Sequence, residues 1–264
     1  MRKAILLDTS KCIACRGCQV ACKNWNQLPA EDTVFNSNFE NPPELSPITW
    51  MRVTFKEEMK DGKFKWYFGS DRCMHCTDAA CMMVCPVGAI YRTETGSVNI
   101  NYDKCIGCNY CVANCPFEAM SFDREANHPV KCTMCIDRTS NGLLPACVKA
   151  CPAGALQYGD RDKLATRASA RVAKLQAEGN NKAGVYGLEE VSGTGTMYVL
   201  ENDPDYYGLP SADIQVPFKA RAWNVIFKPL RVLAVIAVAL GLWGNRSESK
   251  EIQDAASVAK GKES

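Results

Sequence analysis

The sequence has little histidine, little net charge and no long uninterrupted apolar run. Histidine occurs only as His75 and His128, which argues against a histidine-rich metal site. The 31 basic and 29 acidic residues leave a net charge of only +2. A charge balance this close to neutral does not indicate nucleic-acid binding. The first residues lack the apolar stretch and cleavage site of a secretory signal. We therefore expect a protein that stays in the cytoplasm, or one exported already folded with a partner that carries the signal.

Cysteine, by contrast, is abundant, with 16 among the 264 residues. A secreted disulfide scaffold is also rich in cysteine, but a chain of this length can bury a core without disulfides. The cysteines come in short runs, and two residues separate many neighbours, which suits the ligands of one metal centre. The four runs are Cys12, Cys15, Cys18 and Cys22; Cys73, Cys76, Cys81 and Cys85; Cys105, Cys108, Cys111 and Cys115; and Cys132, Cys135, Cys147 and Cys151.

These runs have the pattern that holds [4Fe–4S] clusters. Three closely spaced cysteines ligate three corners of a cube, and in two-cluster ferredoxins the fourth cysteine of a run ligates the other cube. Proline follows the last cysteine of three runs, as Pro86, Pro116 and Pro152. The 16 cysteines therefore predict four closed clusters with a ligand for every iron. Closed clusters leave no iron open to a substrate, so we expect electron transfer and no catalytic site. Structural zinc held by four cysteines per ion is the alternative.

Spacing favours a nested pairing of the runs. Only residues 86–104 separate runs two and three, so these two form one compact unit and runs one and four pair with each other. Sequential pairing is the alternative, but it places the long segment 23–72 inside a ferredoxin unit. The predicted ligand sets are Cys12, Cys15, Cys18 and Cys151 (set 1, for cluster 1); Cys22, Cys132, Cys135 and Cys147 (set 2, for cluster 2); Cys73, Cys76, Cys81 and Cys115 (set 3, for cluster 3); and Cys85, Cys105, Cys108 and Cys111 (set 4, for cluster 4).

Residues beside the cysteines carry weaker signals. Lysine directly precedes the first cysteine of three runs, as Lys11, Lys104 and Lys131. A nearby cation favours the reduced, more negative cluster, but each lysine can equally be a solvated loop residue. His75, inside the second run, either hydrogen-bonds a cluster sulfur or packs behind the cluster.

The remaining local patterns predict hairpins, a helix and an arm. Turn residues at Asp61-Gly62 and Thr95-Gly96 predict hairpins over residues 48–68 and 89–100. Residues 162–178 carry apolar side chains at helical spacing and predict an amphipathic helix that ends at Gly179. Residues 180–216, rich in glycine, asparagine and aspartate, predict an extended arm without a second core.

The longest apolar segment lies near the C-terminus. Its uninterrupted part, residues 232–243, covers roughly 18 Å at about 1.5 Å per residue, which is short of a hydrocarbon core of about 30 Å. A helix that starts at Trp223 is long enough if Lys228 and Arg231 lie near one interface. We therefore expect a single transmembrane helix over residues 221–245, with a buried or interfacial helix as the alternative. The tail 246–264 is polar and expected to be disordered.

Sequence segments other than the cysteine spacing indicate which family of iron–sulfur proteins the chain resembles. The chain resembles the iron–sulfur beta subunit of membrane-bound respiratory formate dehydrogenase, of the formate dehydrogenase-N type, over roughly residues 5–244. The segments that carry this resemblance are Cys18-Gln-Val-Ala-Cys22-Lys-Asn-Trp-Asn, Cys73-Met-His-Cys76, Arg171-Val-Ala-Lys-Leu, Ala183-Gly-Val-Tyr, Gly195-Thr-Met-Tyr-Val-Leu and Tyr207-Gly-Leu-Pro.

The resemblance implies an α+β protein with two nested ferredoxin-like halves, each holding two [4Fe–4S] clusters. Residues 1–72 would pair with residues 131–160, and residues 73–130 would form the central half. Residues 161–220 would hold the helix and C-terminal arm, followed by the single transmembrane helix.

Partners follow from the same resemblance. It implies a catalytic alpha subunit with a molybdenum or tungsten pterin cofactor, and a membrane haem b (gamma) subunit or cytochrome as acceptor. Electrons would enter at cluster 1 and pass clusters 2, 3 and 4 in turn. The cluster domain would lie in the periplasm. A subunit of the same type that serves nitrate, polysulfide or tetrathionate chemistry is the alternative.

Overall fold

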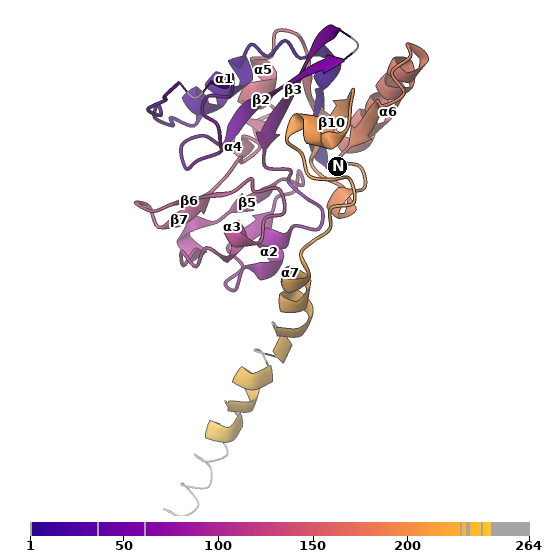
Figure 1. Cartoon of the computed structure of the whole chain (residues 1–264). Coiled ribbons are helices and arrows are strands. Elements are labelled where there is room, and N and C mark those ends of the chain that lie inside the picture. Colours follow the sequence, from indigo (N-terminus) through magenta and orange to yellow (C-terminus); the bar gives the residue numbers. More distant parts are fainter. Residues whose placement is uncertain are drawn as a thin grey trace, which may run out of the picture. The chain divides into compact units, whose positions relative to one another are not determined.

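A computed structural model describes residues 2–35, 37–60, 62–227, 229–230, 233–238 and 240–243. The chain divides into two compact units, Met1–Ala220 and Arg221–Ser264 (Figure 1). All 16 cysteines lie in the first unit.

A four-stranded sheet in the order β8-β1-β10-β9 holds the ends of the first unit together. The central strand β1 (Lys3–Asp8) runs antiparallel to β8 (Leu156–Asp160) and parallel to β10 (Thr196–Leu200). The edge strand β9 (Gly184–Tyr186) pairs antiparallel with β10. Segments far apart in the sequence thus meet in one sheet.

Helix α6 (Arg161–Ala177) covers this sheet with one apolar face. Its buried side chains, Leu164, Ala168, Val172 and Leu175, pack with residues of β1 and β10. They recur every three or four residues, which places them on one side of a helix. The predicted amphipathic helix is confirmed within one residue at each end.

The predicted arm over residues 180–216 is wrong, because this segment supplies two strands of the sheet. Every residue of β10 is buried. The Tyr198 hydroxyl donates to the carbonyl of Ser70 at 2.8 Å, and the Thr196 hydroxyl donates to the carbonyl of Cys73 at 3.1 Å. The local sequence shows a strand-like piece here, but its pairing with β1 is too distant along the chain to be visible in local patterns.

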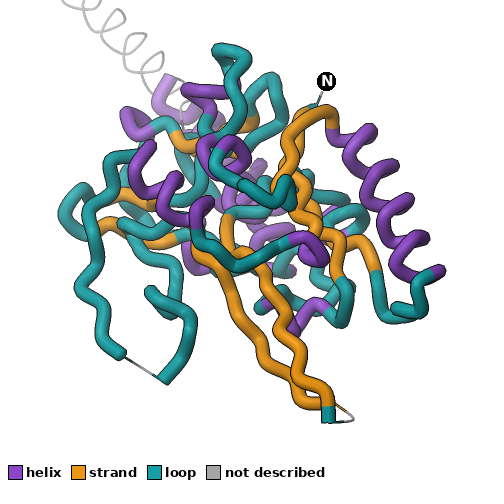
Figure 2. Tube along the Cα trace, turned by 90° about the horizontal axis from the view of Figure 1, so that it is seen from above, coloured by secondary structure: helices purple, strands orange, loops and turns teal. Residues whose placement is uncertain are grey.

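Antiparallel two-stranded ribbons account for the other strands. The pairs are β2 (Met51–Lys60) with β3 (Lys63–Arg72), β4 (Ile90–Arg92) with β5 (Val98–Ile100), and β6 (Ser121–Asp123) with β7 (His128–Val130). The first two ribbons confirm the predicted hairpins. The long β2–β3 ribbon extends away from the rest of the unit (Figure 2).

Short helices carry cysteines of all four runs. They are α1 (Gly17–Trp25) in run one, α2 (Ala80–Val84) in run two, α3 (Tyr110–Ala113) in run three, and α5 (Ala146–Lys149) in run four. A further short helix, α4 (Ile136–Thr139), begins directly after Cys135. Helix α1 packs against α5, and α2 packs against α3 (Figure 1). Run one therefore lies beside run four, and run two beside run three.

The C-terminal segment begins with α7 (Phe218–Ala222) and a π-helical turn, Trp223–Phe227. Within the described residues, no helix is both long and apolar enough to cross a membrane. The predicted span 221–245 falls partly outside the described residues, and the tail 246–264 falls outside them entirely.

Candidate iron–sulfur cluster sites

Three cavities in the first unit are each lined by four cysteines. With adjoining open solvent included, the space inside them is about 410, 340 and 320 Å³. The cysteines in these cavities are Cys12, Cys15, Cys18 and Cys151; Cys73, Cys76, Cys81 and Cys115; and Cys85, Cys105, Cys108 and Cys111, respectively. The structure thus brings together the cysteines of sets 1, 3 and 4.

The cysteines of set 2 meet where α1 packs against α5. Burial is the main cause that raises the pKa of the Cys22 thiol, and the thiols of Cys132, Cys147 and Cys135 raise it further. Burial likewise raises the pKa of Cys132 to about 12, with contributions from Cys135 and Cys147. These mutual effects place the four thiols of set 2 within electrostatic reach of one another.

The cysteine sulfurs of a set do not converge on the position of a single metal ion. In the described part of the chain, no three histidine, cysteine, aspartate or glutamate side chains are arranged to hold a single metal ion. A [4Fe–4S] cube places its four irons at separate corners, and each corner takes one thiolate. Four cysteines around a cavity match that requirement.

A left-handed backbone residue follows the first cysteine of every run by two positions. The four residues and their φ values are Ala14 (52°), His75 (48°), Gly107 (68°) and Met134 (56°). Positive φ is uncommon outside glycine and costs conformational energy. The turn directs amides at the sulfurs, because His75 and Met134 each donate their N–H to the preceding cysteine Sγ at 3.4 Å. Such bonds stabilise an anionic sulfur ligand.

The Cys-Pro ends of the runs repeat a second turn. The residues two positions after the prolines, Gly88, Glu118 and Gly154, all have positive φ. The amide of Ala89 then donates to Cys85 Sγ at 3.2 Å. Run one departs from this pattern, because α1 continues past Cys22. There the Asn26 side-chain amide donates to Cys22 Sγ at 3.7 Å instead.

Two buried side chains offer donors beside these cavities. Arg72 Nε donates to Ser70 Oγ at 2.9 Å and Nη1 to Cys147 Sγ at 3.5 Å, but Nη2 has no hydrogen-bond acceptor among the described residues. His75 Nε2 likewise lacks an acceptor there. Arg72 lines the cavity of set 1, and His75 lines that of set 3. Because buried donors are normally satisfied, these residues fit a bound group that supplies sulfur acceptors.

The sequence reading missed Arg72, although a signal for it exists. A basic residue precedes the first cysteine of every run, and Arg72 occupies this position in run two. Arg72 and Lys131 are buried, whereas Lys104 is exposed and the exposed Lys11 lies 3.7 Å from the Asp8 carboxylate. The solvated-loop alternative therefore fits Lys11 and Lys104 but not Lys131, and an effect of Lys131 on a cluster stays a prediction.

Neighbouring sets approach one another in a fixed order. Besides burial, the thiol of Cys147 raises the pKa of Cys18 to about 12, which links set 1 to set 2. Cys73 contributes in the same way to the raised pKa of Cys132 and links set 2 to set 3. Burial chiefly, with Cys111 among smaller causes, raises the pKa of Cys81 and links set 3 to set 4. The four sets form a row.

Comparison with known proteins agrees with this geometry. Two models described as 4Fe-4S dicluster domain match residues 11–89 and 64–161. The nitrate-inducible formate dehydrogenase iron-sulfur subunit of Escherichia coli (strain K12) is 42% identical over 243 residues, which cover 90% of this chain and 82% of the relative. The formate dehydrogenase-O iron-sulfur subunit of the same organism is 39% identical over 261 residues, covering 94% and 86%. The chain belongs to the family of formate dehydrogenase iron–sulfur subunits.

Other members of the formate dehydrogenase iron–sulfur subunit family match over less of the chain. Formate dehydrogenase 2 subunit beta (cytochrome c-553) of Nitratidesulfovibrio vulgaris is 36% identical over 217 residues, which cover 78% of this chain and 97% of the relative. The two dicluster domains and the 16 cysteines fit four [4Fe–4S] clusters, as predicted. The chain is an electron-transfer subunit of an oxidoreductase complex and not its catalytic subunit.

Proposed function

We propose that this subunit is a linear electron wire for formate oxidation, with cluster 1 to cluster 4 held by cysteine sets 1 to 4. A [4Fe–4S] cluster accepts and releases single electrons with little change in geometry. The observation that carries the proposal is the row of sets. The thiol of Cys147 acts electrostatically on Cys18, that of Cys73 on Cys132, and that of Cys111 on Cys81, which supports an order in which each set neighbours the next.

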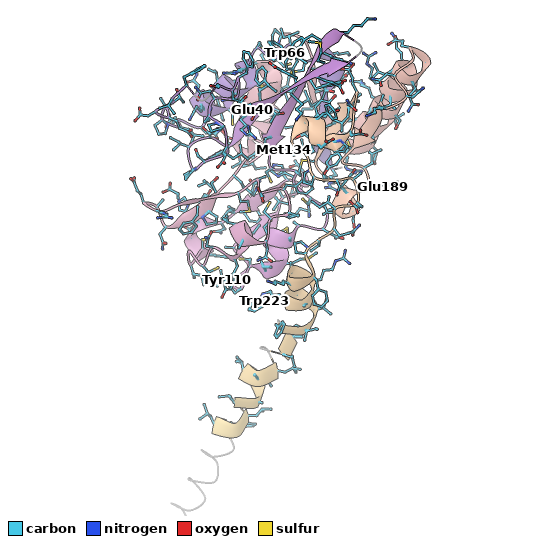
Figure 3. All side chains as sticks on the ribbon, in the orientation of Figure 1. Glu40, Trp66, Tyr110, Met134, Glu189 and Trp223 are labelled. Atoms are coloured by element: carbon cyan, nitrogen blue, oxygen red, sulfur yellow. The ribbon has the colours of Figure 1, made fainter. Side chains whose placement is uncertain are left out.

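The two ends of the row lie near the protein surface. Ile13 and Val20, in run one, are 61% and 63% exposed, and Cys15 of set 1 is exposed. Ile106 and Tyr110, in run three, are 60% and 50% exposed, and Figure 3 shows Tyr110 at the outer edge of the first unit. Exposed apolar side chains suit the docking of partner proteins. This supports a donor at cluster 1 and an acceptor at cluster 4.

The partners are a catalytic subunit that oxidises formate at a molybdenum or tungsten pterin cofactor and a haem-containing acceptor. The family supports the first assignment, because the relatives are named as subunits of formate dehydrogenase. The name of the Nitratidesulfovibrio vulgaris relative contains cytochrome c-553, which supports a haem protein as acceptor. A membrane haem b subunit or a soluble cytochrome can fill this role.

Membrane attachment through residues 221–245 completes the proposal. Leu233, Val235, Val238 and Trp243 all have exposed side chains within the second unit. A run of exposed apolar side chains requires a cover, and a bilayer provides one. The cluster domain would then lie in the periplasm, exported with the partner that carries the signal.

Anaerobic purification of the chain and of its complex tests the function. The chain should carry about sixteen irons, four for each cluster, and should not oxidise formate alone. In the complex, formate should reduce all four clusters in the absence of dyes. Stoichiometric zinc with little iron, or formate oxidation by the isolated chain, would contradict the proposal.

A further inference from the structure

Two fully buried cations lie at the junctions between cysteine sets. Arg72, at the end of β3, is 2% exposed. Its Nη1 donates to Cys147 of set 2 at 3.5 Å, while the residue also lines the cavity of set 1. Arg72 therefore faces the cavity of set 1 and a sulfur of set 2.

Lys131 occupies the next junction. It is 2% exposed, and its ammonium donates to the carbonyls of Val98 and of Cys132, the latter at 3.0 Å. Val98 lines the cavity of set 3, and Cys132 belongs to set 2. Lys131 therefore lies between sets 2 and 3.

Neither cation has a carboxylate partner among the described residues, because no salt bridge joins Arg72 or Lys131 to an aspartate or glutamate there. Burying an unpaired charge is strongly unfavourable, so buried cations are normally neutralised by a nearby anion. A [4Fe–4S] cluster with four thiolate ligands is a net anion and gains a further negative charge on reduction. The clusters are the anions that these two cations face.

We propose that Arg72 and Lys131 are positioning charges that set the reduction potentials of clusters 1, 2 and 3, and that cluster 2, which faces both, is raised the most. The proposal rests on the ligand sets of the proposed function. A fixed positive charge in a low-dielectric interior stabilises the reduced cluster more than the oxidised cluster, because the reduced cluster is more negative. An electron that enters at cluster 1 would thus be drawn onward into cluster 2.

Redox titration of the purified complex, monitored by electron paramagnetic resonance, distinguishes the effects of Arg72 and Lys131 on the midpoint potentials. Arg72→Gln should lower two of the midpoint potentials, and Lys131→Met should lower two. One signal alone should respond to both variants, and it identifies cluster 2 without prior assignment. Each shift should reach at least tenfold in the one-electron equilibrium constant, which is 59 mV.

Matched variants distinguish charge from packing. Lys104 holds the same position in run three but is exposed, so Lys104→Met should change every equilibrium constant by less than about threefold because solvent and salt screen its charge. Arg72→Lys and Lys131→Arg keep the charge and should stay closer to the wild-type potentials than the neutral variants. If a residue had a packing role alone, its charge-keeping variant would shift the potentials as strongly as its neutral variant.

Several outcomes would overturn the proposal. Lys131→Met with full iron content and unchanged midpoint potentials would overturn it. So would a result in which the two signals shifted by Arg72→Gln and the two shifted by Lys131→Met share no member. Equal shifts in Arg72→Lys and Arg72→Gln would do so too. If Arg72→Gln loses iron, Arg72→Lys and Lys131→Met still decide between charge and packing. Fewer than four cluster signals in the wild-type complex would instead contradict the proposed ligand sets, which is a separate failure.

Discussion

The backbone amide of Val98 donates a hydrogen bond to Nδ1 of His75 at 3.0 Å. A ring nitrogen that accepts cannot carry the hydrogen of a neutral imidazole, so the hydrogen of His75 sits on Nε2. Burial, with Lys131 and Arg72 as further causes, holds the pKa of His75 well below its ordinary value, so the ring is neutral. The β4–β5 ribbon thus fixes the side chain that lines the cavity of set 3.

Removal of the His75 donor should lower the potential of cluster 3. In His75→Leu the cluster loses one hydrogen bond, worth about 1 kcal/mol, or about 40 mV for one electron. His75→Gln retains a donor and should lie closer to wild type. His128→Leu, at the other histidine, is the control because His128 does not line this cavity. Redox titration of the complex provides the measurement, and equal shifts in both leucine variants would count against a role for His75.

Cys18 and Cys22 test the wiring, because they lie one turn apart on α1 but belong to different sets. Cys18→Ser should alter the same paramagnetic signal as Cys12→Ser. Cys22→Ser should instead alter the signal that Cys132→Ser alters, and it should leave cluster 1 intact. In the assembled complex, Cys22→Ser should impair quinone or cytochrome reduction more than dye reduction. If Cys22→Ser and Cys12→Ser affect one common signal, each run closes its own cube and the nested sets are wrong.

Met197 tests whether β10 belongs to the core. Its side chain is 0% exposed and packs in the hydrophobic core between the sheet and α6. Met197→Ala should destabilise the protein by about 2–5 kcal/mol, the usual cost of such a truncation in a core, and should lower the midpoint of thermal unfolding. Met59→Ala provides the control, because Met59 is 68% exposed. An unchanged midpoint in Met197→Ala would show that residues 180–216 act as a peripheral arm.

Truncation tests the membrane attachment. A complex whose chain ends at residue 220 should remain in the supernatant after membranes are sedimented, because the apolar segment is gone. A chain that ends at residue 245 lacks only the polar tail and should still sediment with membranes. If the shorter complex also sediments, and no other subunit explains it, residues 221–245 are not the anchor.

Local patterns predicted the features that depend on neighbours in the sequence. The cysteine spacing assigned four sets, and the structure brings those cysteines together around cavities or in mutual electrostatic contact. The turn dipeptides located two hairpins, and helical spacing located α6. Each signal arises from a few consecutive residues, because turn geometry and helix faces are set locally.

Long-range pairing explains the features that were missed. Strand β10 was assigned to an arm because its partner β1 lies at the other end of the sequence. The burial of Arg72 depends on the same packing, because Arg72 lies two residues after Ser70 on β3, and the carbonyl of Ser70 accepts from the Tyr198 hydroxyl of β10. A basic residue before a cysteine looks the same in the sequence whether it ends up exposed, like Lys104, or buried.

The central position of β1 determines the order in which parts of the chain can fold and bind clusters during synthesis. Strand β1 is made before both of its neighbours, and its pairing is complete only after residues 156–160 and 196–200 have been made. Sets 1 and 2 also wait for cysteines of run four, whereas sets 3 and 4 are complete once Cys115 has emerged. Iron–sulfur loading should therefore begin in the middle of the chain and finish at its ends. A nascent chain stalled near residue 125 would already contain the cysteines for two cubes, while its N-terminal run still needs protection from oxygen and from foreign metals.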